Sequence, residues 1–239
     1  MKIAMWSGPR NLSTAMMYSF GARQDCAVWD EPFYAAYLKK TGLIHPMNDE
    51  ILADGETDAR KVIDQLTGSN LHDRAYFYQK HMTHHMIKDI DRSWMSNVTN
   101  VFLIRHPARV ISSYAAKREN PTLDDIGFPQ QAEIFDQVRA SGQVPIVVDS
   151  HDIRDNPEGT LRALCAAIGM PWDAGMLRWP AGGHVDDGVW ASHWYGAVHR
   201  STGFAGAEGP LPKLSEDYKN ISDQAMRHYE HLAAYKLST

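Results

Sequence analysis

Residues 2–14 read KIAMWSGPRNLST, and this stretch decides the fold. A short apolar run at 2–6 passes through a Gly-Pro turn into a helical pattern that begins at Ser13. Proteins of the α/β class use such a turn, at the end of a buried strand, to present backbone N–H groups and a helix N-terminus to a phosphate. We therefore expect an anion-binding loop over Gly8 to Thr14.

Two other interpretations of this loop bear on its chemistry. The nucleotide-binding pattern G-x-x-x-x-G-K-[ST] fails, because Ser13 and Thr14 stand where it needs Gly and Lys. A magnesium nucleoside triphosphate is therefore poorly provided for. Alternatively, the segment is only a tight turn followed by an ordinary Ser/Thr helix cap.

Short apolar runs alternate with helical patterns through the rest of the chain. We expect strands at Lys2 to Trp6, Cys26 to Trp29, Tyr76 to Lys80, Asn100 to Ile104 and Gln143 to Val148. We expect helices at about Ser13 to Ala22, Ala59 to Leu66, Ala108 to Lys117, Gln130 to Ser141, Glu158 to Ile168 and Glu216 to Tyr235. This order predicts an α/β fold with an open, mainly parallel, P-loop-like sheet flanked by helices, in one domain over 1–239.

Composition excludes several classes of function. The 239 residues carry a net charge of −5, so no global positive field favours nucleic acid or an anionic membrane. The two cysteines, Cys26 and Cys165, exclude a disulfide framework or a four-thiolate zinc site. No apolar run approaches about 18 residues, and the run at 1–6 is too short for a signal peptide. We therefore expect a cytoplasmic protein without a membrane span.

A second anion site is predicted at residues 101–114, VFLIRHPARVISSY. A buried strand ends at Arg105, Pro107 occupies the favoured first position of a helix, and Ser113 lies two turns into it. Arg105 leaves the same edge of the sheet as the loop after the first strand, where it can hold an anionic group. The alternative is an ion pair between Arg105 and one of the many acidic residues.

These residues resemble the sulfotransferases that use 3′-phosphoadenosine 5′-phosphosulfate (PAPS). Arg10 to Thr14 looks like the family's 5′-phosphosulfate loop, with Arg in place of the usual Lys, and Arg105 with Ser113 matches its 3′-phosphate ligands. Residues 148–157 are similar to its Asp-x-x-x-x-Pro turn, and Asp30 to Phe33 looks like a Glu-Pro-Phe motif of bacterial members. The resemblance implies transfer of a sulfuryl group from PAPS to a hydroxyl or amine of a small-molecule acceptor, without a metal. It implies donor binding by Gly8, Arg10, Asn11, Leu12, Ser13, Thr14, Arg105, Ser113 and Arg200.

Two weaker matches concern catalysis and the covering of the donor. Residues 78–81, YQKH, fall where the family has Lys-x-His, although Lys80 is adjacent to His81 here. The resemblance implies that His81 is the base, emerging at the carboxyl edge of the sheet, and that Lys80 helps Arg10 at the leaving oxygen. His84 and His85 compete for the role of base, although we expect both to pack away from the donor. Residues 200–206 resemble a late Arg-x-Gly-x-x-Gly loop, with one extra residue before the first Gly.

Several alternatives remain open. The long segment Gly182 to Lys213 is predicted to be a lid or a binding loop, and residues 190–195 line an acceptor pocket or simply pack into the core. The histidines at 81, 84 and 85 match no zinc pattern, so we expect no metal. Two other functions compete with sulfuryl transfer: a P-loop phosphotransferase for a small substrate and a non-catalytic nucleotide-binding module. The acceptor and the oligomeric state are not readable from the residues.

Overall fold

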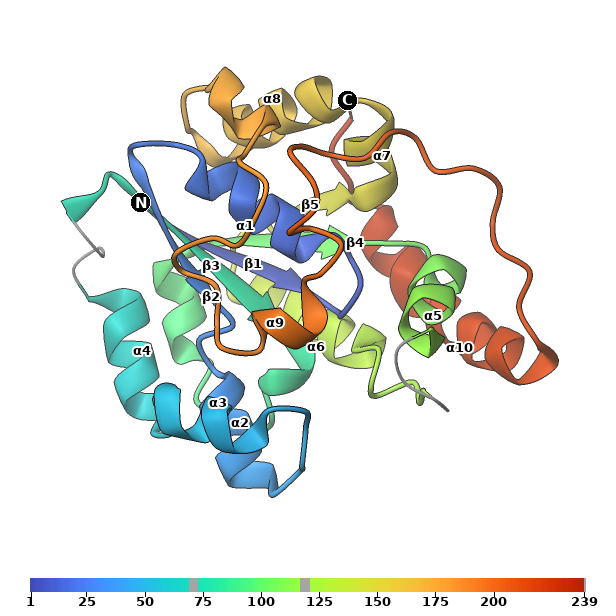
Figure 1. The fold of residues 1–239 in the computed structure, drawn as a ribbon, viewed down its shortest axis with the longest axis horizontal. Coiled ribbons are helices and arrows are strands. Elements are labelled where there is room, and N and C mark those ends of the chain that lie inside the picture. The colour runs from blue at the N-terminus through green and yellow to red at the C-terminus, as the bar shows by residue number, and fades with distance from the viewer. Residues whose placement is uncertain (69–72, 117–120, 239) are drawn as a thin grey trace.

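A parallel sheet forms the centre of the chain (Figure 1). The computed structural model describes residues 1–68, 73–116 and 121–238. Within them the strands are β1 (Lys2–Ser7), β2 (Cys26–Asp30), β3 (Tyr76–Met82), β4 (Thr99–Ile104) and β5 (Ile146–Asp149). Their order is β2-β3-β1-β4-β5, and all paired neighbours are parallel. The expected open α/β architecture is confirmed.

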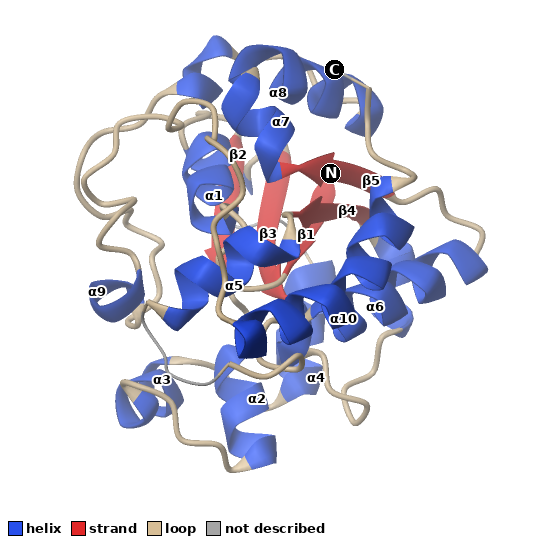
Figure 2. Cartoon of the chain, turned by 90° about the vertical axis from the view of Figure 1, so that its right-hand side faces the viewer, coloured by secondary structure: helices blue, strands red, loops and turns tan. Residues whose placement is uncertain are grey.

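Helices cover both faces of this sheet (Figure 2). The α-helices are α1 (Ser13–Gly21), α2 (Tyr34–Thr41), α3 (Asn48–Asp54), α4 (Ala59–Thr67), α5 (Pro107–Ala115), α6 (Phe128–Ala140), α7 (Ser150–Asp155), α8 (Pro157–Ile168), α9 (Ala191–Trp194) and α10 (Glu216–Ala233). Helices α1 and α8 pack on one face, whereas α4, α6 and α10 pack on the other. Both faces of the strands are therefore buried, which explains why the strands read as continuous apolar runs.

Strand alternation divides the core into these two layers. In β1, Ile3 and Met5 contribute to the layer of α1 and α8, and Ala4 and Trp6 contribute to the opposite layer. The same period of two governs β3. A shift of one residue along a strand therefore moves a side chain to the other face of the sheet.

The expected elements are found, with differences at their ends. Strand β3 continues to Met82, two residues beyond the expected end at Lys80, and β5 begins at Ile146 rather than at Gln143. The helix expected to reach Lys117 ends at Ala115 as α5, and Lys117 itself lies outside the described residues. Helices α2, α3, α7 and α9 were not predicted. They have four to eight residues each, too few for a hydrophobic period to be distinct.

The segment between α8 and α10 is mostly irregular, as expected. It contains a short 3₁₀ helix at Ala174–Leu177 and an isolated antiparallel bridge between Arg178 and Gly203. Within the described residues, no helix has the length and apolar character that crossing a membrane requires.

Candidate functional site

A cavity of about 1430 Å³ opens at the carboxyl edge of the sheet. One part of its lining is the loop after β1, together with Arg105 and Ser113; we call this the arginine wall. Another part consists of Glu31, Lys80 and Tyr195, which we call the lysine wall. The long segment that follows α8 completes the cavity with residues from 177–179 and 193–205.

Backbone geometry fixes the loop between β1 and α1. Gly8 lies so close to the Ile126 carbonyl that an added Cβ would stand 2.5 Å from its oxygen. Arg10 and Leu12 both have left-handed backbone conformations, with φ of 63° and 73°, and such non-glycine strain concentrates at functional sites. Buried Asn11 donates from Nδ2 to the Leu103 carbonyl at 3.2 Å and ties the loop to β4.

The start of α1 is not capped in the ordinary way. Leu12 occupies the N-cap position, and its side chain makes no capping hydrogen bond. The expectation of a Ser/Thr cap at the start of this helix is therefore wrong. Ser13 and Thr14 instead line the cavity within the first turn of the helix, where the partial positive charge of the helix N-terminus favours an anion.

The two predicted anion sites meet in the arginine wall. Arg10 donates from Nε to the Ser113 hydroxyl at 2.9 Å, and Arg105 donates from Nη1 to the Arg10 carbonyl at 2.6 Å. Burial and, secondarily, the neighbouring Arg105 charge lower the pKa of Arg10. Arg200 lines the same cavity. Residues far apart in the sequence thus form one cationic surface.

Arg105 also has an acidic partner, as the alternative interpretation expected. Its Nη2 forms an ion pair with Glu208, from the segment before α10. Arg105 itself lines the cavity, so the same guanidinium serves the arginine wall and this ion pair.

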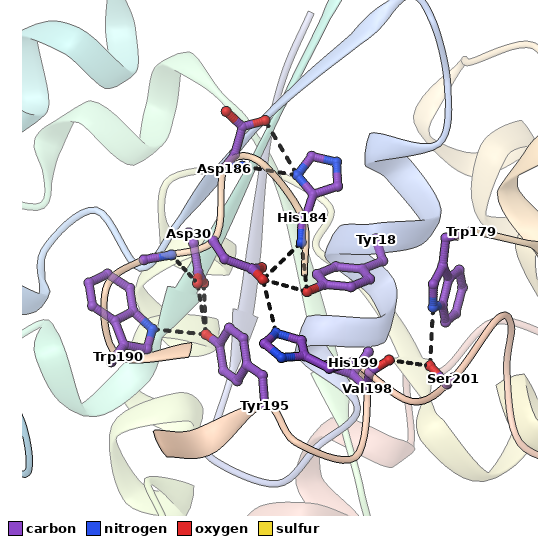
Figure 3. A network of polar contacts seen from close by, with 12 residues as sticks. Tyr18, Asp30, Trp179, His184, Asp186, Trp190, Tyr195, Val198, His199 and Ser201 are labelled. Carbon is purple, nitrogen blue, oxygen red and sulfur yellow. Dashed lines mark hydrogen bonds and ion pairs between the residues drawn. The ribbon is translucent and has the colours of Figure 1, made fainter. Parts of the chain in front are cut away.

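The lysine wall is a buried charge network. Lys80 is 1% exposed, and its Nζ donates to Asp30 Oδ1 at 2.8 Å, to Glu31 Oε1 at 2.7 Å and to the Tyr195 hydroxyl. Figure 3 shows the hydroxyl of Tyr195 between Asp30 and the indole nitrogen of Trp190. Burial alone would lower the pKa of Lys80, but the charges of Asp30 and Glu31 outweigh it and raise that pKa.

Glu31 is held in an unusual conformation at the end of β2. Its φ is 41°, and its N–H donates to the Lys80 carbonyl at 3.0 Å. Burial raises the pKa of this carboxyl group, and the Lys80 charge opposes the rise. Glu31 is thus a buried, strained carboxylate at the cavity with a raised pKa, which is the environment of many catalytic bases.

His81 lies on the opposite side of the sheet from the cavity. Because β3 continues to Met82, His81 is still inside the strand, and alternation turns it away from Lys80. Its ring stacks on Trp6 with centroids 4.5 Å apart, and burial lowers its pKa to about 3. The expectation that His81 emerges at the carboxyl edge is wrong, and it is not among the described residues that line the cavity.

The side chain two positions after Lys80 is Met82, which does line the cavity. His84 and His85 follow it and line the cavity as well, contrary to the expectation that both pack away. The ring of His85 stacks between those of Tyr34 and Tyr37, at centroid distances of 4.6 and 4.8 Å. Burial lowers the pKa of His85 well below its ordinary value, so this histidine is a weak base.

The segment 182–205 is anchored to the body of the protein at several points. Tyr18 of α1 donates to Asp187, which also contacts Nε2 of His199 at 3.1 Å. Figure 3 shows Tyr18 and His199 close together, with His184 beside Tyr18. Trp190 and Tyr195 pack in a core cluster with Tyr34, as the core interpretation of residues 190–195 expected, whereas His193, Trp194 and Tyr195 line the cavity. That this part of the cavity takes an acceptor stays a prediction. No group of three potential metal ligands is found in the part of the chain that the structure describes.

The sequence did not predict the roles of four residues of this region. Asp30 and Glu31 stood in a recognised motif, but no role was expected for them. Tyr195 and Glu208 reach the site from a segment without periodicity. The only signal for the acids was their position directly after a buried strand, at the edge where the other strands also end.

The fold and the cavity define an α/β protein with a cationic surface at the carboxyl edge of its sheet. Residues 1–236 match the family described as Sulfotransferase domain, and the chain belongs to that family. It is 39% identical over 204 residues to "Branched-chain-amino-acid aminotransferase-like protein 1" of Arabidopsis thaliana, and 37% identical to protein 2 of the same name. Each match covers 85% of this chain, which spans only 36% of the length of either relative.

Solved structures support the same fold. The sulfotransferase domain of the Synechococcus PCC 7002 olefin synthase matches with a TM-score of 0.52 at 15% identity, covering 94% of both chains. The sulfotransferase domain from the curacin biosynthetic pathway matches with a TM-score of 0.50 at 15% identity, covering 99% of this chain and 98% of that one. At this identity the likeness concerns the fold alone.

Proposed function

We propose that this protein transfers a sulfuryl group from PAPS to a hydroxyl or amine of a small-molecule acceptor. The family supports the reaction class. The observation that carries the donor assignment is the arginine wall, where Arg10 contacts Ser113 and Arg105 contacts the Arg10 backbone. PAPS carries two separated anionic groups, and this wall joins two separately predicted anion sites.

Each donor contact follows from the chemistry of the wall. The backbone and hydroxyls of the loop ending at Ser13 and Thr14 would hold the phosphosulfate. Arg105, Ser113 and Arg200 would hold the 3′-phosphate. Arg10 would stabilise the negative charge that develops on the bridging oxygen as the bond to sulfur breaks. Gly8 and Asn11 would act indirectly, because they fix the shape of the loop.

We infer that Glu31, rather than His81, is the general base. In the reaction, the acceptor O–H or N–H loses its proton to the Glu31 carboxylate as the acceptor atom bonds to sulfur. The sulfur–oxygen bond to the donor breaks, and adenosine 3′,5′-bisphosphate (PAP) leaves. A carboxylate with a raised pKa accepts this proton more readily than an ordinary one.

Lys80 serves as a positioning residue in this proposal. An ammonium group has three N–H donors, and those of Lys80 face Asp30, Glu31 and Tyr195. The expected help of Lys80 at the leaving oxygen would require it to abandon one of these partners. We therefore propose that Lys80 orients Glu31 and keeps it ionised, while Arg10 alone acts on the donor.

Calorimetric titration with PAP in the absence of magnesium tests the donor. We expect micromolar-range affinity and at least tenfold weaker binding of 5′-AMP, which lacks the 3′-phosphate. At about 100 times the dissociation constant, PAP should raise the free energy of unfolding by roughly 2.7 kcal/mol. Unchanged thermal stability at that concentration would refute the donor assignment.

A turnover assay separates the competing functions. PAPS is incubated with panels of hydroxyl and amine compounds, and the release of PAP is measured. Acceptor-dependent release supports the proposal. Binding of PAP without release in any panel would indicate a non-catalytic module, and magnesium-dependent cleavage of a nucleoside triphosphate would indicate a phosphotransferase.

A further inference from the structure

Glu208 is surrounded by arginines at the carboxyl edge of the sheet. Its Oε1 lies 2.8 Å from Arg154 Nη1, its Oε2 lies 3.0 Å from Arg109 Nε, and Arg105 forms the third ion pair. The Glu208 side chain is only 3% exposed. Burial raises the pKa of Glu208, but the arginines, Arg105 first, outweigh it and lower that pKa. The group is therefore an ionised carboxylate inside a cationic pocket.

The backbone around Glu208 is docked by the same arginines. Arg154 donates from Nε to the Gly206 carbonyl at 2.9 Å, and Arg109 donates to the Gly209 carbonyl. Figure 1 shows this orange-red segment passing α7 before it turns away toward α10. Arg109 lies on α5 and Arg154 on α7, so elements that follow β4 and β5 both hold the segment.

Arg105 stands between this pocket and the cavity. Arg105 lines the cavity, whereas Arg109, Arg154 and Glu208 are not among the described residues that do so. One N–H of Arg105 is engaged by the Arg10 carbonyl and another by Glu208. Its Nε is buried without a hydrogen-bond partner among the described residues. The guanidinium is thus directed partly away from the cavity while it retains an unused donor.

We propose that Glu208 is an internal competitor that the 3′-phosphate of the donor must displace from Arg105. The proposal rests on the donor assignment made above. A phosphate is best bound by a pair of parallel N–H groups of one guanidinium. In this structure a carboxylate occupies part of that fork, and two like-charged groups at one guanidinium repel each other.

Arg109 and Arg154 set the strength of the competition. Both pair with Glu208, and neither is among the described residues that line the cavity, so they stabilise the state in which Arg105 is occupied. Loss of either arginine should therefore leave donor affinity unchanged or increase it. A direct role in holding the phosphate predicts the opposite, because each would then contribute a charge-assisted hydrogen bond.

The decisive variant is Glu208→Gln, which keeps the side-chain shape and removes the charge. We expect the affinity for PAP to increase roughly five- to tenfold, within the range that one ordinary net hydrogen bond contributes. The affinity for 5′-AMP should change less than about twofold, because it lacks the competing phosphate. The affinity of Glu208→Asp for PAP should lie between those of the unmodified protein and Glu208→Gln. The matched control is Glu133→Gln, since Glu133 also pairs with an arginine, Arg92, but on the outer surface of α6.

The outcomes separate this proposal from the donor assignment. Binding of PAP to the unmodified protein without a gain in Glu208→Gln overturns the competition alone. Equal gains for PAP and 5′-AMP also overturn it, because they indicate a general field effect. No binding of PAP by either protein overturns both proposals. Thermal melting of each variant confirms folding, and Arg154→Ala gives an independent test, since weaker PAP binding in that variant contradicts the competition.

Discussion

The arginine wall and the lysine wall line one cavity but treat charge in opposite ways. Arg10 donates to the neutral hydroxyl of Ser113, so its charge remains available to an incoming anion. Lys80 faces two carboxylates and is fully engaged before any ligand arrives. Among the described residues, Arg10 pairs with no carboxylate, whereas Arg105 pairs with Glu208 and Lys80 pairs with two carboxylates. A compensated wall is suited to holding a base in place rather than to binding the donor.

The two walls also differ in which elements of the chain supply their residues. The arginine wall is built from the loop between β1 and α1, from Arg105 directly after β4, and from Ser113 in the following helix α5. The lysine wall joins the ends of β2 and β3 to Tyr195, a residue 115 positions after Lys80. Both walls join residues about 100 positions apart, but the residues of the arginine wall stand in local strand-turn-helix motifs, whereas Tyr195 of the lysine wall stands in none.

The largest expected effect is on turnover in Glu31→Gln. General-base catalysis contributes about 10²- to 10⁴-fold, so turnover should fall by that factor while PAP affinity stays within a few fold. Because the pKa of Glu31 is raised above its usual 4.5, activity of the unmodified protein should be lost as pH falls through a value above 4.5. Steady-state rates of PAP release against pH measure both effects.

The matched control for this prediction is His81→Asn. His81 packs against Trp6 on the other face of the sheet, so turnover of the folded variant should stay within a few fold. The assignment of Glu31 fails if its replacement is tolerated while His84→Asn or His85→Asn abolishes turnover. A loss of turnover in folded His81→Asn would restore the expectation from the sequence.

The next effect is on stability in Lys80→Met. Removing one partner of a buried ion pair leaves an uncompensated charge and costs about 3 to 5 kcal/mol. Without Lys80 the folded-state pKa of Glu31 should rise further, because the opposing Lys80 charge is gone, so the folded protein binds more protons than the unfolded chain. The loss of stability should therefore be smaller at pH 5 than at pH 8.

Urea denaturation of both proteins at the two pH values measures this loss. Lys236→Met is the control, because Lys236 forms a half-exposed ion pair with Asp152 on the surface. That pair should contribute less than about 1 kcal/mol. If both variants lose the same free energy of unfolding, the buried Lys80 network contributes no more to stability than a surface ion pair.

The smallest expected effect concerns donor affinity in Arg105→Ala. We expect PAP binding to weaken by about 1.5 to 3 kcal/mol, the contribution of a hydrogen bond to a charged group. Binding of 5′-AMP should hardly change in this variant. The control is Arg162→Ala, which removes a surface arginine paired with Glu158 and should change neither the PAP affinity nor the 5′-AMP affinity. Calorimetric titration measures all four affinities. If 5′-AMP binding falls as much as PAP binding, Arg105 does not contact the 3′-phosphate.

The sequence by itself determined the order of strands and helices and the composition of the arginine wall. These features depend on residues adjacent in the chain: a buried strand, a Gly-Pro or Arg-His-Pro turn, and a helix directly behind it. Parallel strands bring their carboxyl ends to one edge, so the placement of Arg10 and Arg105 on the same rim of the sheet followed from the motifs, whereas their direct contact is a finding of the structure.

Only the tertiary structure decided the lysine wall and the partner of Arg105. Side chains alternate between the two faces of a strand, so only one of Lys80 and His81 can face the cavity. His81 would leave the strand only if β3 ended before it. Pairing with β1 instead extends β3 to Met82. Tyr195 and Glu208 lie in an aperiodic segment more than 100 positions from Lys80 and Arg105. Their positions are fixed by long-range packing and ion pairs, which no local pattern of residues encodes.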